Sequence, residues 1–592
     1  MFPKWNRTKE TILTETNAKP AGETTAADVA LSWRAALLCV ALAATAVITP
    51  MLFLGNASGH DIQFHLASWM DAAGQWREGI VLPRWAEWAN WGFGEPRFIF
   101  YPPASWLAGA ALGSLLPWRI VPGAFIWLAL VGAGMAMWTL AREWLRPREA
   151  IAAAVLFAVN PYHLVIAYYR SDFAELGAAA LLPLLVWAAL GAARGQSRRA
   201  LLLAIVFAGS WLWNAPEGVI ATYALALLFI VECVARRSFA PLVRGGSAMT
   251  GGFGLAAFYI LPAWWEERWV QISYAASDYL DVARNFLFTH STDADFMRFN
   301  WKVSAVAVGM MAATAAAAIL AWRNRRESPE IWRPEIRRML AVLAVASTLL
   351  MFPVTLFLWR RLPELQFVQF PWRWLGPLGV PFAFFPAVAI HRGGKWRGAW
   401  LAILIGAGTI GAGVAMVRSA WWDSNDAAFV WNEIRSGHGY EGADEYQPIG
   451  CDRSELPGSP DAAKKYEPPI PRVTKLDPKS SEMVPAAGVR LHIARWSAER
   501  KTFDAETAAP VTLALRLVNY PAWQVRVDGA VVQPQLMEDT AQMLLPLGPG
   551  RHRVEAHFRR TWDRTLGGAI SLLFGGAMLV FWVRSRRAAG AL

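Results

Sequence analysis

Residues 35–54 read AALLCVALAATAVITPMLFL, twenty residues without a charged side chain. A helix needs an apolar run of about 17–25 residues to cross the hydrocarbon core of a bilayer. Runs of this length recur along most of the 592-residue chain, in which 55% of the residues are hydrophobic and only 17% are charged. The sequence therefore predicts an α-helical, polytopic integral membrane protein with about twelve spanning helices.

The basic residues gather in short clusters between the apolar runs, near residues 142–148, 194–199, 236–244, 323–338, 392–397 and 584–587. Such loops normally stay in the cytoplasm. Every cluster lies on that side, with both termini inside, if the spans are residues 35–54, 120–141, 149–167, 174–193, 200–214, 217–235, 246–262, 303–322, 339–358, 374–390, 398–417 and 565–583. The net charge of +12 therefore follows from topology, and we expect no nucleic-acid partner.

The apolar stretch at residues 104–116 is left over from this arrangement. It is too short for a span, and counting it as one would invert every later loop against its charge. We therefore expect a re-entrant or interfacial helix there. Residues 56–119, 168–173, 263–302, 359–373 and 418–563 would then face outward together.

The chain divides into regions along its length. They are a cytoplasmic tail at 1–30 before an uncleaved signal anchor, a membrane domain at 31–417 with a large first outer loop at 56–119, an irregular outer linker at 418–487, an outer β domain at 488–563, and a last span with its cytoplasmic tail at 564–592. In the β domain, apolar and polar residues alternate at 511–517, 523–527, 543–547 and 553–558, with turns at 527–529 and 548–550. This predicts an antiparallel β-sandwich without a catalytic constellation.

The first outer loop begins with HDIQFH at residues 60–65, directly after the first span. Asp61 could act there as a general base or bind a metal ion, or it could simply cap the following helix. His60 and His65 could join Asp61 in a metal site, although a pair of histidines is weak evidence for one.

Further along this loop come LPRW at 82–85, WGFGEPR at 91–97 and FYPP at 100–103. Gly and Pro at this density fix the course of a loop, while Trp and Tyr101 offer faces on which a sugar can stack. Glu95 and Arg97 place a carboxylate and a cation in one tight turn. An ordinary interfacial loop is the alternative.

The second outer loop reads YYRSDFAE at residues 168–175. Ionisable groups at a membrane boundary cost free energy unless they are paired or solvated, which favours a functional role for Arg170, Asp172 and Glu175. A surface ion pair is the alternative. NAPE at 214–217 is a weaker case of the same kind.

A further outer loop enters a span with QFVQFPWRW at residues 366–374. Arg373 lies between Trp372 and Trp374, at the depth of the lipid headgroups. An arginine there could bind phosphate oxygens through both of its terminal nitrogens, or its side chain could merely snorkel to the surface.

These segments together resemble the bacterial membrane proteins related to 6-pyruvoyl-tetrahydropterin synthase, which despite that name are similar to glycosyltransferases of the GT-C type. The resemblance rests on Asp61 with His65 four residues later, the Leu-Pro-x-Trp and Gly-x-Gly-x-Pro turns leading to Tyr-Pro-Pro, the loop at 170–175 and the Gln-Phe-Pro-Trp-Arg segment. NYPAW at 519–523 followed by VDG at 527–529 is similar to the outer β domain of related enzymes. Relatives often have Arg-Gly where this chain has Arg170-Ser171.

The resemblance implies a GT-C-like membrane domain with a periplasmic β-sandwich, which transfers a sugar from a polyprenyl-phosphate carrier to a glycan, lipid or protein acceptor, with inversion. The reaction would take place at the outer face of a bacterial inner membrane. Asp61 would be the general base, Asp172 and Glu175 the further catalytic carboxylates, and Arg170 and Arg373 the cations for the phosphate. The remaining candidates for substrate or donor binding are His60, His65, Glu95, Arg97, Tyr101 and Trp372.

Some GT-C enzymes need a divalent metal ion, for which Asp61, Glu95 and Asp172 are the candidate ligands. A transporter or flippase for lipid-linked glycans is the main alternative, although transporters place their ionisable residues near the midplane of the bilayer. A ligase or polymerase that moves a whole glycan and a non-catalytic membrane scaffold are the other two alternatives.

Overall fold

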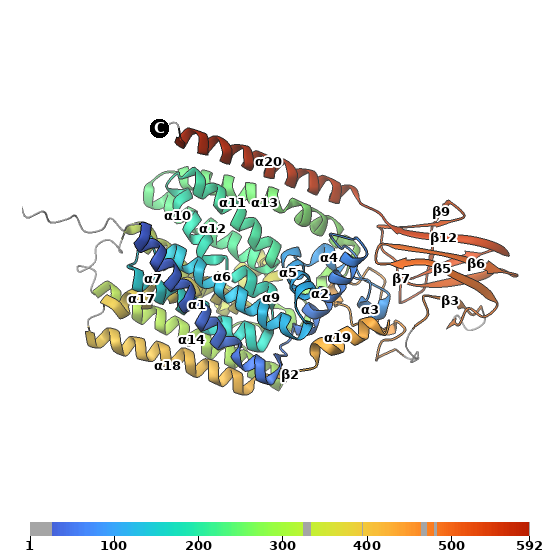
Figure 1. Ribbon diagram of the computed structural model, residues 1–592, viewed down its shortest axis with the longest axis horizontal. Helices are drawn as coiled ribbons and strands as arrows, with labels where there is room; N and C mark the ends of the chain where they lie inside the picture. Colours follow the sequence, from blue (N-terminus) through green and yellow to red (C-terminus); the bar gives the residue numbers. More distant parts are fainter. Residues whose placement is uncertain (1–25, 324–332, 393–394, 463–469, 479–481, 591–592) are drawn as a thin grey trace, which may run out of the picture.

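The computed structural model of the protein describes residues 26–323, 333–392, 395–462, 470–478 and 482–590 (Figure 1). It comprises a helical bundle with a β domain at one end. Nearly all of the predicted tail at 1–30 lies outside the described residues. In the part that is described, nine helices are long and apolar enough to cross a membrane, or ten if one bent pair is counted as a span.

A helix occupies each of the twelve predicted spans. The helices are α1 (Ala26–Leu54), α6 (Val121–Ala141), α7 (Pro147–Ala158) with α8 (Pro161–Val165), α9 (Phe173–Ala179) with α10 (Leu182–Ala193), α11 (Ser197–Trp213), α12 (Ala215–Arg236), α13 (Ala240–Glu266), α14 (Ala294–Arg323), α15 (Pro334–Leu350), α17 (Leu375–Arg392), α18 (Lys395–Ser419) and α20 (Trp562–Gly590). Of these, α11, α13 and α15 are not among the nine helices above, and α15 is the first half of the bent pair.

The predicted span at 339–358 is wrong in its second half. Helix α15 ends at Leu350, and the chain turns by 93° into η9 (Pro353–Thr355) and α16 (Leu356–Arg361). Phe352 is extended, at φ −111° and ψ 148°, because the ring of the following Pro353 disfavours helical geometry. Trp359 closes the bend by donating a hydrogen bond to the carbonyl of Leu350 at 3.2 Å.

The leftover apolar stretch forms a short helix, α5 (Pro103–Leu115), of 13 residues. It packs against α2 (Ile62–Arg77), the first helix of the outer loop (Figure 1). Gly109 permits this approach, since a Cβ there would lie 2.1 Å from the ring of Trp69. Both helices are therefore fixed by packing between protein surfaces, directly beside the cluster of ionisable residues described below.

The β domain is a sandwich of two antiparallel five-stranded sheets, with strand orders β10-β11-β7-β3-β4 and β5-β6-β12-β8-β9. The strands are β3 (Val473–Leu476), β4 (Met483–Val484), β5 (Val489–Ser497), β6 (Arg500–Thr507), β7 (Val511–Val518), β8 (Trp523–Val527), β9 (Ala530–Val532), β10 (Gln535–Leu536), β11 (Gln542–Leu547) and β12 (Gly550–Phe558). The four alternating segments of the sequence correspond to β7, β8, β11 and β12.

The segment predicted as an irregular linker, 418–487, contributes ordered elements. Strands β3 and β4 complete one sheet, β2 (Trp422–Asp423) pairs with β1 (Asn56–Ala57), and α19 (Asp426–Arg435) is a helix. The pairings of β2 with β1 and of β3 with β7 join residues far apart in the sequence, so the local composition rich in Gly and Pro did not indicate them.

The first outer loop is built into the base of the sandwich. Trp85, which is buried, lies in the same hydrophobic core as Trp523, with their ring centroids 5.6 Å apart. Arg516 on β7 donates hydrogen bonds to the carbonyls of Trp91 at 2.9 Å and His438 at 2.8 Å. The loop and the β domain consequently form one packed body.

Candidate functional site

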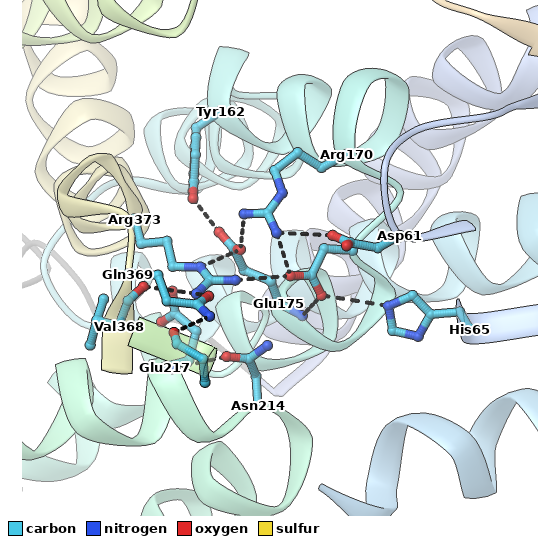
Figure 2. A network of polar contacts seen from close by, with 12 residues as sticks. Asp61, His65, Tyr162, Arg170, Glu175, Asn214, Glu217, Val368, Gln369 and Arg373 are labelled. Carbon is cyan, nitrogen blue, oxygen red and sulfur yellow. Dashed lines mark hydrogen bonds and ion pairs between the residues drawn. The ribbon is translucent and has the colours of Figure 1, made fainter. Parts of the chain in front are cut away.

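Ionisable side chains from separate segments converge where the bundle meets the first outer loop (Figure 2). Asp61 precedes α2, Arg170 ends the π-helical turn η2 (Ile166–Arg170), and Arg373 lies in η11 (Pro371–Trp374). The cluster consists of these three residues with His65, Asp172 and Glu175. We call this set the Asp61–Arg373 cluster.

Two irregular backbone features aim Arg170 into the cluster. The π-helical turn ends with a hydrogen bond from the Ser171 N–H to the Ile166 carbonyl at 2.7 Å, and such turns are frequent at functional sites. Ser171 itself is left-handed, at φ 55° and ψ 33°, a conformation in which glycine is the usual residue. Its hydroxyl donates to the Ala57 carbonyl at 2.6 Å and accepts from the Gly59 N–H at 3.1 Å. Serine thus ties the second outer loop to the first.

The backbone of the first loop positions Asp61. Its N–H donates to the Arg170 carbonyl at 2.9 Å, and its carboxylate accepts from Arg170 Nη2, also at 2.9 Å. Asp61 stands at the N-cap position of α2, but its side chain makes no capping hydrogen bond. The interpretation of Asp61 as a mere helix cap is therefore wrong.

The remaining ion pairs are buried. Arg170 lies 3.2 Å from Asp172 and 3.3 Å from Glu175, while Arg373 lies 3.3 Å from Asp172 and 3.0 Å from Glu175. These four side chains are at most 6% exposed, whereas that of Asp61 is 34% exposed. The alternative of a surface ion pair is excluded by this burial, which costs several kcal/mol per ion before pairing.

Arg373 does not snorkel to the surface. Its guanidinium donates to the Val368 carbonyl at 2.8 Å and to the Gln369 side chain at 3.3 Å, in addition to its two carboxylate partners. Trp372 is buried and lies under Arg170, whose Cζ is 5.1 Å from the centre of the ring. Trp372 therefore supports the guanidinium of Arg170, while the backbone of the loop at 366–374 holds the guanidinium of Arg373.

Asp172 is held ionised. Burial alone would raise the pKa of its carboxyl, but the neighbouring His65 ring and the charges of Arg170 and Arg373 outweigh burial and lower that pKa below its usual range. His65 Nε2 lies 3.7 Å from Asp172 Oδ1. Asp172 Oδ1 also accepts a hydrogen bond from the Glu175 N–H at 2.9 Å. This hydrogen bond caps the N-terminus of α9.

Two further residues complete the surroundings of Glu175: Tyr162, which was not among the predicted site residues, and Glu217, which belongs to the weaker candidate segment at 214–217. Tyr162 donates from its hydroxyl to Glu175. The sequence feature that could have indicated Tyr162 is Asn160-Pro161, which interrupts an apolar span. The Asn160 side chain accepts a hydrogen bond from the Tyr162 N–H at 3.0 Å and caps the helix that begins there. Glu217 is buried beside the cluster, and neither of its carboxyl oxygens has a hydrogen-bond partner among the described residues. Because an unpaired buried carboxylate is very costly, we expect Glu217 to carry a proton.

Glu95 and Arg97 form a separate buried pair, 2.6 Å apart. Arg97 also donates to Ser68 at 3.1 Å, and Glu95 accepts from the Ala443 N–H at 3.0 Å. Their partners lie on α2 and on the segment before the β domain, so the pair fastens the loop and has no hydrogen bond to the Asp61–Arg373 cluster in the described structure. Arg97 also donates to the Phe64 carbonyl at 3.5 Å and stacks on the Phe64 ring, 4.2 Å from its centre; Phe64 directly precedes His65 of the cluster.

Tyr101 and His60 flank the cluster. The Tyr101 ring lies 5.8 Å from that of His65. Burial, together with the negative charges of Asp172 and Asp61, raises the pKa of Tyr101 well above its usual value, so its phenol stays protonated and can donate a hydrogen bond. His60 is exposed and packs edge-on against Phe299, at 5.1 Å between ring centroids.

The predicted metal ligands do not come together. Glu95 belongs to the separate pair, and Asp61 and Asp172 both bind Arg170, whose guanidinium lies between them. Throughout the described ranges, no group of three or more His, Cys, Asp or Glu side chains is arranged to hold a metal ion.

The family described as "6-pyruvoyl-tetrahydropterin synthase related domain; membrane protein" matches residues 98–418, more than half of the chain. The match includes Arg170, Asp172 and Arg373, while Asp61 precedes it. No curated protein matches the sequence.

Two solved structures of the oligosaccharyltransferase from Archaeoglobus fulgidus are similar to this chain, each at 15% identity over 74% of it. The apo crystal structure has a TM-score of 0.40, and the complex with an inhibitory peptide and a dolichol-phosphate has one of 0.43. The chain covers 62% and 61% of the length of those two proteins, respectively.

Proposed function

The chain belongs to the family of membrane proteins related to 6-pyruvoyl-tetrahydropterin synthase, and we propose that it is a GT-C type glycosyltransferase. In this proposal it moves a sugar from a polyprenyl-phosphate donor to a nucleophile on the acceptor, at the outer face of a bacterial inner membrane. The proposal rests on the resemblance of its loop motifs to such enzymes and on the composition of the Asp61–Arg373 cluster.

One observation carries the proposal. Asp61, 34% exposed, is the carboxylate of the cluster that reaches solvent, and it touches Arg170, which is 6% exposed. A base that faces an aqueous acceptor is thus placed directly beside buried cations that could bind a phosphate. The cluster also lies at the end of the spans, where a lipid-linked substrate can keep its tail in the bilayer while its head reaches water.

In the proposed reaction, Asp61 takes the proton of the acceptor hydroxyl as its oxygen attacks the anomeric carbon of the sugar. The bond between that carbon and the phosphate oxygen breaks, and the electron pair leaves with the polyprenyl phosphate. Attack from the face opposite the phosphate inverts the anomeric centre. A positioned general base contributes about 10²- to 10⁴-fold to such a step.

The leaving phosphate gains negative charge and needs cations, not an acid. Arg170 and Arg373 are fixed by carboxylates, carbonyls and aromatic rings before any substrate arrives, which is the arrangement that gives electrostatic stabilisation its effect. Asp61 and an incoming phosphate would compete for Arg170 Nη2. Donor binding would therefore free the Asp61 carboxylate to face the acceptor.

The test is glycosyl transfer by purified protein in liposomes, offered a panel of polyprenyl-phosphate sugars, with release of polyprenyl phosphate as the signal. Asp61→Asn should lose at least about 100-fold in rate while its thermal unfolding stays unchanged. Asp295→Asn is the matched control, because that carboxylate is 90% exposed and lies outside the cluster. Full activity of Asp61→Asn would overturn the assignment of the base, and failure to consume any donor would favour transport or a scaffold.

A further inference from the structure

The opposite end of the bundle holds a cavity of about 590 Å³ between α11, α13 and α20. Helix α11 runs from Ser197 at the cavity to Trp213 beside the cluster, so the two sites are separated by the length of that helix. Most of the lining is apolar, and it includes Ala200, Leu201, Ala204, Ala248, Phe574 and Met578. The volume falls in the range of about 300–1,000 Å³ that is usual for ligand sites.

Helix α20 packs against α13 at glycines, and the cavity lies beside these contacts, where the bundle presents mostly small residues. A Cβ on Gly254 would lie 2.4 Å from the Phe574 ring, and one on Gly567 would lie 2.5 Å from the Ala257 carbonyl. On α11 and α13 the lining consists largely of the small residues Ser197, Ala200, Ala204, Ser247 and Ala248, beside the larger Leu201, Val243 and Arg244. Val243 and Phe581 at its edge are 65% and 45% exposed, so the cavity opens toward the surroundings of the bundle.

The end of the cavity is polar and positively charged. Arg244, Gln196 and Ser197 line it there. Arg244 donates to the Ala193 carbonyl at 3.3 Å but has no carboxylate partner in the described part of the chain. The 17-residue helix α11 begins at Ser197 without a side-chain cap, so its first N–H groups point to the same place. An unpaired guanidinium beside a helix N-terminus is suited to phosphate.

We infer that this cavity binds one anionic membrane phospholipid, with its phosphate at Arg244 and the start of α11 and an acyl chain between α11, α13 and α20. The mostly apolar walls suit an acyl chain, and the charge at the polar end suits an anionic headgroup. The lipid would fasten α20, which is otherwise poorly buried, to the bundle. Because α20 follows β12 directly, the lipid would also steady the β domain (Figure 1).

Native mass spectrometry of the full chain, delipidated in detergent, tests this with phosphatidylglycerol and phosphatidylcholine. One phosphatidylglycerol should bind at least about tenfold more tightly than phosphatidylcholine, and inorganic phosphate should not displace it. Arg244→Ala should abolish the preference between headgroups, while Ala200→Phe should weaken the binding of both lipids by filling the groove. Arg148→Ala is the control, since this exposed arginine lies at the same end of the bundle but outside the cavity.

Equal binding of the two lipids to the wild type, or unchanged selectivity in Arg244→Ala, would overturn the inference. Displacement by inorganic phosphate would indicate an anion site without a lipid, which contradicts it as well. Ala200→Phe makes the test independent of any effect of Arg244 on folding. Since neither substitution touches the Asp61–Arg373 cluster, failure of this inference leaves the proposed glycosyl transfer unaffected.

Discussion

Replacing Gly59 with alanine should disable the Asp61–Arg373 cluster without changing any of its charged groups. A Cβ on Gly59 would lie 2.4 Å from the Arg170 carbonyl carbon and 2.6 Å from the Tyr169 carbonyl oxygen. Both are backbone atoms of the tightly bound second outer loop, so they cannot swing aside as a flexible side chain would. The first loop must therefore move away from Arg170.

The size of this movement follows from the contact. Carbon atoms pack at about 3.5 Å or more, so the two backbones must separate by about 1 Å. That displacement stretches the hydrogen bond from the Asp61 N–H to the Arg170 carbonyl, now 2.9 Å, beyond the useful range, and moves the Asp61 carboxylate by a similar amount. A misplacement of about 1 Å at a reacting group costs about 10²-fold in rate. Loss of this hydrogen bond and of the one from the Gly59 N–H to the Ser171 hydroxyl should cost only about 2 kcal/mol of stability.

The assay is release of polyprenyl phosphate by reconstituted protein, combined with thermal unfolding. We expect kcat/KM to fall about 100-fold in Gly59→Ala while the protein remains folded. Gly74→Ala is the control, because this glycine lies in α2 and a Cβ added to it would meet no heavy atom within 4 Å. Alanine there should stabilise the helix by up to about 1 kcal/mol. Turnover of Gly59→Ala within threefold of wild type would refute the claim that the spacing between Asp61 and Arg170 matters.

Three further substitutions test other parts of the structure. If the Glu217 carboxyl is neutral, Glu217→Gln should change the free energy of unfolding, measured by chemical denaturation, by less than about 1 kcal/mol. A decrease of more than about 3 kcal/mol in that free energy would show that the carboxyl is charged. Because the folded pKa of Asp172 is lowered, its ionised form stabilises the fold above the unfolded pKa of about 4, and this contribution is lost as pH falls through the lower folded value. The difference in melting temperature between wild type and Asp172→Asn should thus be constant from pH 8 to 5 and shrink only below about pH 4; a decrease already at pH 6 contradicts this. Arg516→Ala removes the hydrogen bonds that hold the first outer loop against the sandwich, so proteolysis at this junction should become at least about tenfold faster. Replacing the exposed Arg526 with alanine should leave the rate unchanged. Equal rates for the two variants would mean that Arg516 does not fasten the two parts.

Much of the fold could be predicted because the bilayer imposes a strong pattern on sequence. Apolar runs located the twelve helices, and alternation located β7, β8, β11 and β12. The same topology put Asp61, Arg170, Asp172 and Arg373 on one face, where the structure brings them together. Charge at the outer ends of the spans was therefore informative about the site as well as about the fold.

Other features depend on contacts that the sequence pattern does not record. Glu95 and Arg97 have the same residue types as the cluster, yet their hydrogen bonds to the Ala443 N–H and to Ser68 make them part of the support for the loop. Tyr162 resembled a core aromatic residue of an apolar span, because only the fold places its hydroxyl on Glu175. Local sequence shows the chemistry that a residue can do, and long-range packing decides whether it does so.

The cluster joins two parts of the molecule that are anchored differently. Arg170 and Arg373 belong to spans of the bundle, whereas Asp61 leads into α2, on which Asp71 accepts a hydrogen bond from Tyr440 at 2.8 Å. Through that contact and the buried aromatic residues of the first loop, α2 is coupled to the β domain. The candidate base is thus attached to the outer part as well as to Arg170, whereas the candidate phosphate-binding cations belong to the membrane part. The contact between Asp61 and Arg170 is the one ion pair of the cluster that joins these two parts and includes a partly exposed carboxylate, whereas the pairs among Arg170, Arg373, Asp172 and Glu175 are buried within the membrane part.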